Sequence, residues 1–380
     1  MRTRIRLIAT LVAVTGVVAC RGDDRARRAS PRAGDTLRIG VLALPMRQRA
    51  TLPPVSLALE AYNATRRAGS APLGVVAPRV GEERLDALAR WQRDPRVVAV
   101  IGAEGAEPTL AAASLLRGEV ERGAEPTPLV TVSASARLVT GVTPWLFRLA
   151  PRVDVLAREM LRTARDSLHA RTIAVAHSAD VVGREALGTM VALQDSLGVR
   201  LVATVAYDES LHDLPLAARQ VAAARPDLLV VVSGDVTLTA QLLREVRRIA
   251  PRLPVLGGPA ISGLAEWGDE FVGMPWVGDA AAGAIDAAFL ARLARRAPDS
   301  TGRTPLVGAF AARAHDAAQL VALAVGRVGA DRSRLRDVVS AGLPSGTPGL
   351  VSDGAIRFET GNDGAIALRT YRLASRAVRP

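Results

Sequence analysis

The residues of this chain that could do chemistry stand where apolar runs end. The chain has four histidines, and only His177 ends such a run. No cysteine and no HExxH pattern accompanies His177, as a metal site would require, and no GxSxG turn supplies a serine nucleophile. We therefore predict no metal site and no catalytic residue.

The composition excludes further kinds of chemistry. All 49 basic residues are Arg, so none of the 380 residues is a Lys. A phosphate-binding P-loop and a Schiff-base enzyme both depend on a lysine amine. The stretch "IGAEGAE" (residues 101–107) departs from the GxGxxG fingerprint of dinucleotide-binding proteins. We expect no enzymatic activity and no cofactor.

The net charge of +12 does not indicate a nucleic-acid partner. The first 34 residues hold eight Arg and two Asp, a charge of +6, so the rest of the chain carries the other +6. Aromatic residues make up 3% of the chain, too few for platforms on which bases stack. We expect no nucleic acid among the partners.

Five loops that follow apolar runs consist of small, polar or acidic residues. Such residues let backbone N–H groups and hydroxyls approach a ligand, and the helix that follows adds a positive field. The same residue types also cap helices, so each loop by itself fits either role. The five loops read "IGAEGAE" (101–107), "VSASA" (132–136), "AHSAD" (176–180), "SGDV" (233–236) and "GGPAIS" (257–262).

The elements that carry these loops alternate along the chain. Near-continuous apolar runs of four to eight residues are typical of strands buried on both faces, as in "RVVAVIG" and "DLLVVVSG". Amphipathic helical patterns lie between them, for example over residues 153–168. This alternation predicts an α/β fold with parallel sheets, in which ligands bind at the carboxyl ends of the strands.

The alternation forms two series, which predict two Rossmann-like lobes joined by a multi-strand hinge. The first series ends near "TPWLFRLAP" (143–151), a stretch suited to crossing between lobes. We assign residues 35–147 and 281–345 to lobe 1, and residues 148–280 and 346–380 to lobe 2. The stretch "GAIRFETGNDGAIALRTYRL" (354–373) predicts two strands around a Gly/Asn/Asp turn.

The first 34 residues have the features of a targeting segment. Residues 1–19 combine three Arg with an apolar run that is too short to span a bilayer, as in a secretory signal peptide. The stretch "VVAC" (17–20) resembles the bacterial lipobox, which implies lipidation of Cys20, the only cysteine, and anchoring to the membrane. An ordinary cleaved signal is the alternative. Residues 20–34 are polar and predict a disordered tether.

Several stretches, in their order along the chain, resemble the type I periplasmic binding proteins. This family includes the substrate-binding lipoproteins of ABC transporters for leucine and other branched-chain amino acids. The stretches cover most of the chain from about residue 36 to residue 373. They include "IGVLALP", "ALEAYNA", "DPRVVAVIGAEGAEPTLAAA", "TPLVTVSASARLVT", "LFRLAP", "AHDAAQLVALAV" and "RFETGND".

The resemblance implies which residues contact a ligand between the lobes. Gly105 and Ala106 stand where the family commonly has a pair of serines. Ser133 and Ser135 stand in the loop where it has Ala and Thr. Backbone N–H groups and hydroxyls at these four positions are expected to bind a ligand carboxylate.

Other positions depart from the pattern of the amino-acid binders. Val182 replaces a Tyr, Asp235 stands where an aromatic residue is usual, and Pro259 stands near the place of an acid that holds an ammonium group. Asp235 could supply that acid or cap the helix that follows it. Phe310 occupies a late aromatic position, and "MRQRATLPP" (46–54) replaces a Gly-rich stretch.

The resemblance implies a lipoprotein on the periplasmic face of the cell envelope that works with an ABC permease. It would bind a small polar ligand, such as an amino acid, an amide or a related carboxylate. The departures keep a second function open, a ligand-sensing or protein-interaction lipoprotein such as a cell-wall synthase activator. Buried polar groups in the cleft favour transport, whereas a filled cleft favours interaction.

Overall fold

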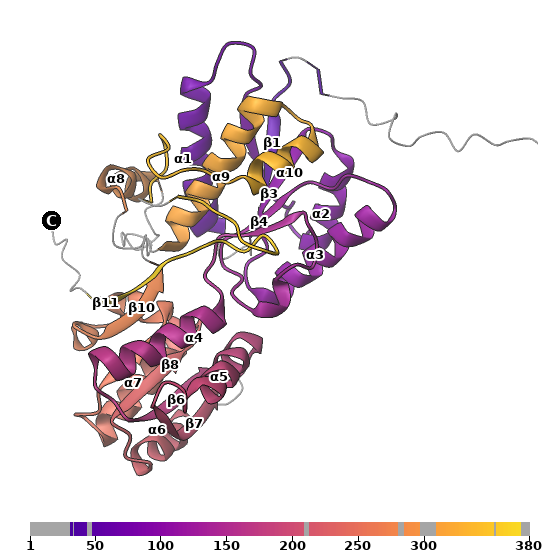
Figure 1. Ribbon diagram of the computed structural model, residues 1–380. Coiled ribbons are helices and arrows are strands. Elements are labelled where there is room, and N and C mark those ends of the chain that lie inside the picture. The colour runs from indigo at the N-terminus through magenta and orange to yellow at the C-terminus, as the bar shows by residue number, and fades with distance from the viewer. Residues whose placement is uncertain are drawn as a thin grey trace, which may run out of the picture.

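The computed structural model describes residues 31–32, 34–43, 48–208, 213–279, 285–296, 309–352 and 355–373. Cys20 and the predicted signal peptide lie outside these residues. The chain forms two lobes, each built around one sheet (Figure 1). No helix in the described ranges has the length and apolar character needed to cross a bilayer.

The first lobe is built around a five-stranded sheet in the order β2-β1-β3-β4-β5. All four pairings of neighbouring strands are parallel. The strands are β1 (Leu37–Leu42), β2 (Leu73–Val76), β3 (Val97–Gly102), β4 (Leu129–Thr131) and β5 (Leu146–Arg148).

Helices cover both faces of this sheet, because its strands are apolar on both sides. Ile39 and Val41 pack in a cluster with residues of α1 (Gln48–Thr65), α9 (Ala309–Val328) and α10 (Arg332–Ser340). Leu42 packs in a different cluster with residues of α2 (Arg84–Arg93) and α3 (Ala106–Glu121). The helix α8 (Ala287–Arg296) contributes Phe289 to a smaller cluster beside α1 and α9. The figure shows α9 lying along α1, although the two are far apart in sequence (Figure 1).

The second lobe is built around a six-stranded sheet in the order β11-β10-β9-β8-β6-β7. Its pairings are parallel except for that of β10 with β11, which is antiparallel. The strands are β6 (Thr172–Ser178), β7 (Arg200–Tyr207), β8 (Leu228–Val232), β9 (Val255–Gly257), β10 (Pro275–Asp279) and β11 (Leu368–Arg372).

The second sheet is also covered on both faces. Ile173 and Val175 pack with residues of α4 (Val153–Arg162) and α5 (Val181–Leu193). The alternate residues Ala174 and Ala176 pack with residues of α6 (Leu214–Ala223) and α7 (Val236–Ile249). Shorter helical turns are η2 (Arg137–Val139), η3 (Thr163–Ser167), η4 (Pro259–Glu266) and η5 (Asp269–Phe271). The predicted α/β fold with mostly parallel sheets and interleaved helices is therefore confirmed.

The chain passes between the lobes after β5, after β10 and again after α10 (Figure 1). The last passage contains the turn predicted within residues 354–373, with Gly361 and Asn362 at positive φ, and an antiparallel bridge joins Phe358 to Gly364 across it. Among the described residues of this segment, β11 is the one regular strand, so the first of the two predicted strands is reduced to isolated bridges. The segment also pairs with β5, because Arg148 N–H donates to Asn362 O and Gly364 N–H donates to Arg148 O.

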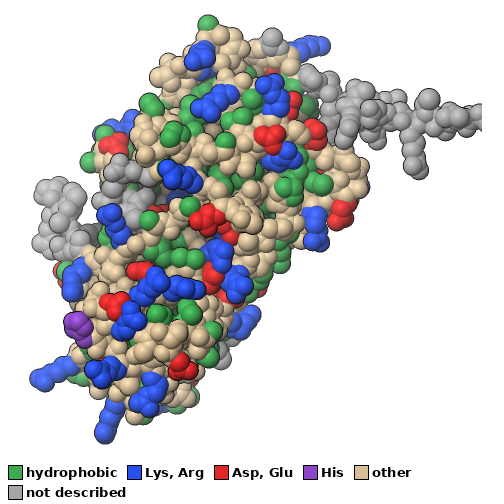
Figure 2. Space-filling model, viewed as in Figure 1, with side chains coloured by type: hydrophobic (Ala, Val, Ile, Leu, Met, Phe, Trp, Pro, Cys, Tyr) green, Lys and Arg blue, Asp and Glu red, His purple; other side chains and the backbone are tan. Residues whose placement is uncertain are grey.

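The surface carries its Arg side chains over both lobes. On the face shown in Figure 2 they are interspersed with Asp and Glu side chains. Many are paired locally, such as Arg248 with Glu245 at 2.9 Å and Arg90 with Glu82 at 2.8 Å. Paired charges of this kind form a mixed surface on that face, without a single basic patch.

Candidate functional site

The loops after β3 and β4 meet at the edge of the first sheet. The Gly105 N–H donates to Ser133 Oγ at 3.1 Å. Gly105 has a φ of +84°, which favours glycine, and it directly precedes α3, whose first residue is Ala106. The structure therefore brings together Gly105, Ala106 and Ser133 at a helix N-terminus, where an anion is stabilised. Their predicted contact with a ligand stays a prediction.

Ser135 lies in the same loop and ties it to the passage between the lobes. Its backbone carbonyl accepts a hydrogen bond from Val153 N–H, the first residue of α4, at 2.9 Å. The Ser135 side chain is half-buried. This loop is therefore fixed to the start of the second lobe through its backbone, whatever its side chains bind.

Val182 lies at the N-terminus of α5, which Asp180 caps. The Asp180 Oδ1 accepts from Gly183 N–H and from Ser178 Oγ, both at 2.8 Å. Val182 is half-buried and packs against two clusters, one in each lobe. The first-lobe cluster includes Ala106. An apolar side chain thus joins the lobes beside the first-lobe loops, at the position where a Tyr was expected from the resemblance.

Asp235 and Phe310 have structural partners of their own. Asp235 caps α7, because its Oδ1 accepts from Leu238 N–H at 2.9 Å. Phe310 is half-buried in the first turn of α9 and packs against the first-lobe core. Among the described residues, no hydrogen bond joins Asp235 to the Gly105–Ser133 contact. Of the two roles predicted for Asp235, the structure shows the helix cap.

His177 is buried at the end of β6, with 5% of its surface exposed. Its Nδ1 lies 2.8 Å from Ser178 O, so a backbone carbonyl holds the ring. Within the described ranges, no group of three or more His, Cys, Asp or Glu is placed to hold a metal ion.

Arg313 on α9 contacts strand ends of both sheets, and sequence reasoning did not single it out. Its Nε donates to Val132 O, directly after β4, at 3.1 Å. Its Nη1 lies 3.2 Å from Asp279 Oδ2, at the end of β10. The side chain is 17% exposed, and burial lowers the pKa of the guanidinium while the charge of Asp279 opposes that shift. The signal in the sequence was an Arg inside the apolar run "AFAARA".

Glu104 is a second buried charge at a strand end that was not singled out. It lies two residues after the end of β3, and 4% of its surface is exposed. Thr51 of α1 donates to its Oε1 at 2.7 Å. It lies inside the loop "IGAEGAE", where only the small residues had been chosen. The strand ends of the first lobe therefore hold a buried acid as well as small residues.

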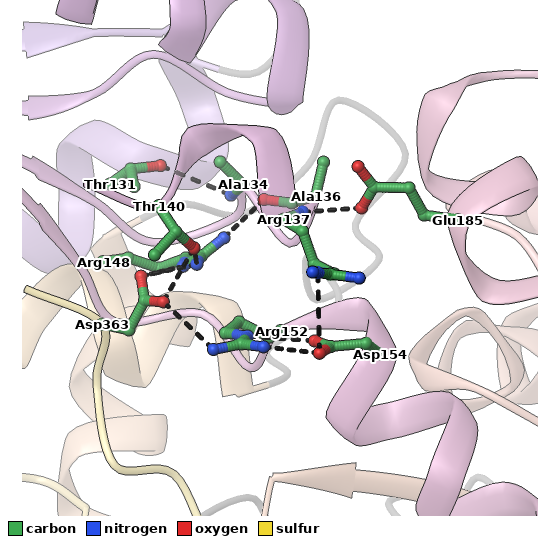
Figure 3. A network of polar contacts seen from close by, with 10 residues as sticks. All are labelled: Thr131, Ala134, Ala136, Arg137, Thr140, Arg148, Arg152, Asp154, Glu185 and Asp363. Carbon is green, nitrogen blue, oxygen red and sulfur yellow. Dashed lines mark hydrogen bonds and ion pairs between the residues drawn. The ribbon is translucent and has the colours of Figure 1, made fainter. Parts of the chain in front are cut away.

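A buried polar network lies where β5 leaves the first sheet (Figure 3). Arg148 donates from Nε to Asp363 Oδ1 at 2.9 Å and from Nη1 to Ala136 O at 2.6 Å. Thr140 Oγ donates to the other carboxylate oxygen of Asp363 at 2.8 Å. Arg148 is 1% exposed. The network fixes the first passage between the lobes to the last one, since these residues come from both.

A cavity of about 740 Å³ lies beside this network, between η2, α4 and α5. None of the residues predicted to contact a ligand lines it. Figure 3 shows some of its lining residues, namely Arg137, Thr140, Arg152, Asp154 and Glu185. At this cavity Arg137 N–H donates to Glu185 at 2.6 Å, so η2 of the first lobe is bonded to α5 of the second.

Three solved structures illustrate what this fold is similar to. A leucine-binding protein of Thermotoga maritima is 18% identical, with 89% of this chain and 96% of that chain covered and a TM-score of 0.70. A branched-chain amino acid transporter substrate-binding protein of Streptococcus pneumoniae, in complex with isoleucine, is 18% identical, with coverage of 90% and 97% and a TM-score of 0.71. A solute-binding protein of an ABC transporter from R. palustris, in complex with 4-hydroxybenzoate, is 16% identical, with coverage of 90% and 94% and a TM-score of 0.71.

The family assignment comes from the sequence match itself. No curated protein matches the chain significantly over its sequence. The model of a family described as periplasmic binding protein matches residues 81–370, which is most of the chain. Together with two α/β lobes whose strand ends are joined by Arg313, this match shows that the chain belongs to the periplasmic binding protein family.

Proposed function

We propose that this protein is a lipid-anchored, extracytoplasmic solute-binding protein of an ABC transporter. It holds a small polar ligand between its two lobes and presents both lobes to a permease. The ligand is an amino acid, an amide or a related carboxylate. The observation that carries this proposal is the position of Arg313, between the carboxyl ends of β4 and β10.

Arg313 has the geometry of a ligand-binding cation. Its contacts, to Val132 O and Asp279, use Nε and Nη1 and leave Nη2 without a partner in the described part of the chain. A guanidinium forms two parallel hydrogen bonds to a carboxylate, and a partly buried guanidinium is screened less by water. The leucine, isoleucine and 4-hydroxybenzoate named for similar structures are all carboxylates.

The Gly105–Ser133 loop supports the same ligand class. The Ser133 hydroxyl accepts from Gly105 N–H, so its own proton remains available to an acceptor on a ligand. The α3 N-terminus adds a positive field. Glu104, a buried residue that directly precedes Gly105, supplies an acid for a ligand that also carries an ammonium group.

A thermal-shift screen of amino acids, small carboxylates and their amides tests the proposal. A ligand at 100 times its Kd stabilises the protein by about 2.7 kcal/mol. We expect a hit that is lost in Arg313→Gln and in Ser133→Leu. The matched control is Arg327→Gln, an exposed Arg in the last turn of the same helix, which we expect to leave the hit unchanged. A hit with equal affinity in Arg313→Gln would contradict the proposed site.

The lipid anchor is tested separately on the full chain. Cells that express it are labelled with radioactive palmitate, and the variant Cys20→Ser is the control. We expect the label in the wild type and none in Cys20→Ser. An unlabelled, secreted wild type would indicate an ordinary cleaved signal.

One observation favours the second candidate function, a protein-interaction lipoprotein with the same fold. Val182 places an apolar side chain between the lobes, where it packs against both. If the folded protein responds to no compound in the screen, that result supports the interaction function. The next experiment is then crosslinking in intact cells to identify a protein partner.

A further inference from the structure

The cavity between η2, α4 and α5 has none of the predicted ligand contacts in its lining, and five of its eleven lining residues are charged. Arg137 lies on η2, Arg152 and Asp154 at the start of α4, Arg158 one turn further along α4, and Glu185 on α5. Its volume of about 740 Å³ is within the range of sites for small molecules.

The two acids of the cavity already have partners. Asp154 accepts from Arg152 Nε at 3.0 Å and from its Nη2 at 2.5 Å. Burial raises the pKa of Asp154, but the hydrogen bonds and charge of Arg152 outweigh this effect, so the pKa is lowered and the group stays ionised. Glu185 uses Oε2 to accept from Arg137 N–H at 2.6 Å.

Two arginines of the cavity, in contrast, have most of their donors free. Arg158 is exposed, and no residue in the described part of the chain pairs with it. The guanidinium of Arg137 approaches Asp154 only at 3.9 Å and is 64% exposed. Each guanidinium has five N–H donors in a planar arrangement that matches carboxylate and phosphate oxygens. The unmet charge of the cavity is therefore positive.

The wall opposite these arginines is made of small residues. Gly188, Thr189 and Ala192 of α5 line the cavity. A Cβ built on Gly188 would meet no atom within 4 Å, so this part of the helix surface is open. A ligand can therefore reach the helix backbone between the arginines and α5.

We propose that this cavity is a second binding site, which takes a small organic polyanion with carboxylate or phosphate groups. Arg137 and Arg158 bind its anionic groups, and the Glu185 Oε1, which has no partner among the described residues, accepts from a hydroxyl of the ligand. The site includes residues of both lobes, so an occupant bridges η2 and α5 in addition to the Arg137–Glu185 hydrogen bond.

Isothermal titration of the purified protein with citrate and, separately, with pyrophosphate tests this site. Both probes are polyanions, and they distinguish a carboxylate site from a phosphate site. We expect one of them to bind the wild type at least tenfold more tightly than Arg158→Gln. Gly188→Leu introduces a side chain into the cavity from α5, at a position where a Cβ would meet no atom within 4 Å, so we expect it to abolish binding.

The matched control is Arg162→Gln, one turn further along α4. Arg162 pairs with Glu159 at 3.7 Å and does not line the cavity, so we expect its affinity for the probe to equal that of the wild type. Melting temperatures of the variants that are no lower than that of the wild type exclude unfolding as the cause of a loss. The proposal is overturned if neither probe binds the wild type at millimolar concentration. It is also overturned if Arg158→Gln and Gly188→Leu bind as well as the wild type, since binding then occurs elsewhere.

Discussion

Removing the buried carboxylate in Asp363→Asn should destabilise the protein more than removing the charge of any exposed side chain. The Asp363 side chain is 5% exposed and its partner Arg148 is 1% exposed. Their contacts join β5 to the last passage between the lobes. Burial lowers the pKa of Arg148 and the charge of Asp363 opposes this shift, so the carboxylate is what keeps a buried cation favourable.

The size of the effect follows from the loss of one partner in a buried ion pair. Such a loss typically costs about 3–5 kcal/mol, because the remaining charge is buried without compensation. The Asn amide oxygen can still accept one hydrogen bond from Arg148, so we expect about 3 kcal/mol. The double variant Arg148→Met, Asp363→Leu removes both charges, so its free energy of unfolding should fall by less than that of the single variant. It should still fall, because Ala136 O loses its hydrogen-bond donor.

Urea unfolding followed by circular dichroism measures these differences in free energy. The control is Glu359→Gln, an exposed acid four residues earlier in the same segment, which should change the free energy of unfolding by less than about 0.5 kcal/mol. If the free energy of unfolding falls by less than about 1 kcal/mol in Asp363→Asn, the Arg148–Asp363 pair does not stabilise this passage. A double variant as unstable as the single one would contradict the charge argument.

Two other predictions concern charge and close packing. Hydrogen bonds from Arg90 lower the pKa of Glu82 from 4.5 to about 2. The Glu82 carboxylate therefore stabilises the folded state fully above about pH 4.5, and this effect is lost as the pH falls towards 2. The melting temperatures of wild type and Glu82→Gln should differ at about pH 6 and converge near pH 2. A Cβ on Gly183 would lie 1.9 Å from Ser178 O, so Gly183→Ala should lower the free energy of unfolding in urea by about 1–3 kcal/mol. Gly188→Ala in the same helix should raise it by about 0.5–1 kcal/mol, because a Cβ there meets no atom within 4 Å. Equal effects of the two variants would refute the packing argument.

The strands that sequence reasoning identified are those buried on both faces. Continuous apolar runs predicted β1, β3, β4, β6, β8 and β9, and the structure contains all six. The same criterion missed β2, β5 and β7, which lie at the edges of their sheets, and β10, which lies inside the second sheet. Six of the eight residues of β7 are partly or fully exposed, and Thr204 divides its sequence "RLVATVAY" into two apolar runs of three residues each. The search for near-continuous apolar runs of four or more residues therefore does not detect β7.

The loops of the candidate site could be predicted, but the charge pairs between them could not. A loop follows its strand directly in sequence, so the loops 101–107 and 132–136 were found from local pattern, and the family resemblance then singled out Gly105, Ala106 and Ser133 within them. Arg313 and Asp279 are 34 residues apart, and Arg148 and Asp363 are 215 apart. No local period connects such positions, because only the packing of α9 and the return of the chain to β5 bring them together.

The contacts between the lobes also limit the free energy that a ligand must supply to close them. Opening the lobes separates Arg137 from Glu185, Arg313 from Asp279, and Val182 from the first-lobe cluster. These contacts are made by the chain's own residues, so they lower the free energy that binding has to provide for closure. Apparent affinity increases with the fraction of molecules already closed. A chain that replaces an expected Tyr by Val182 can therefore give up contacts to the ligand and still bind it, because part of the closure comes from its own residues.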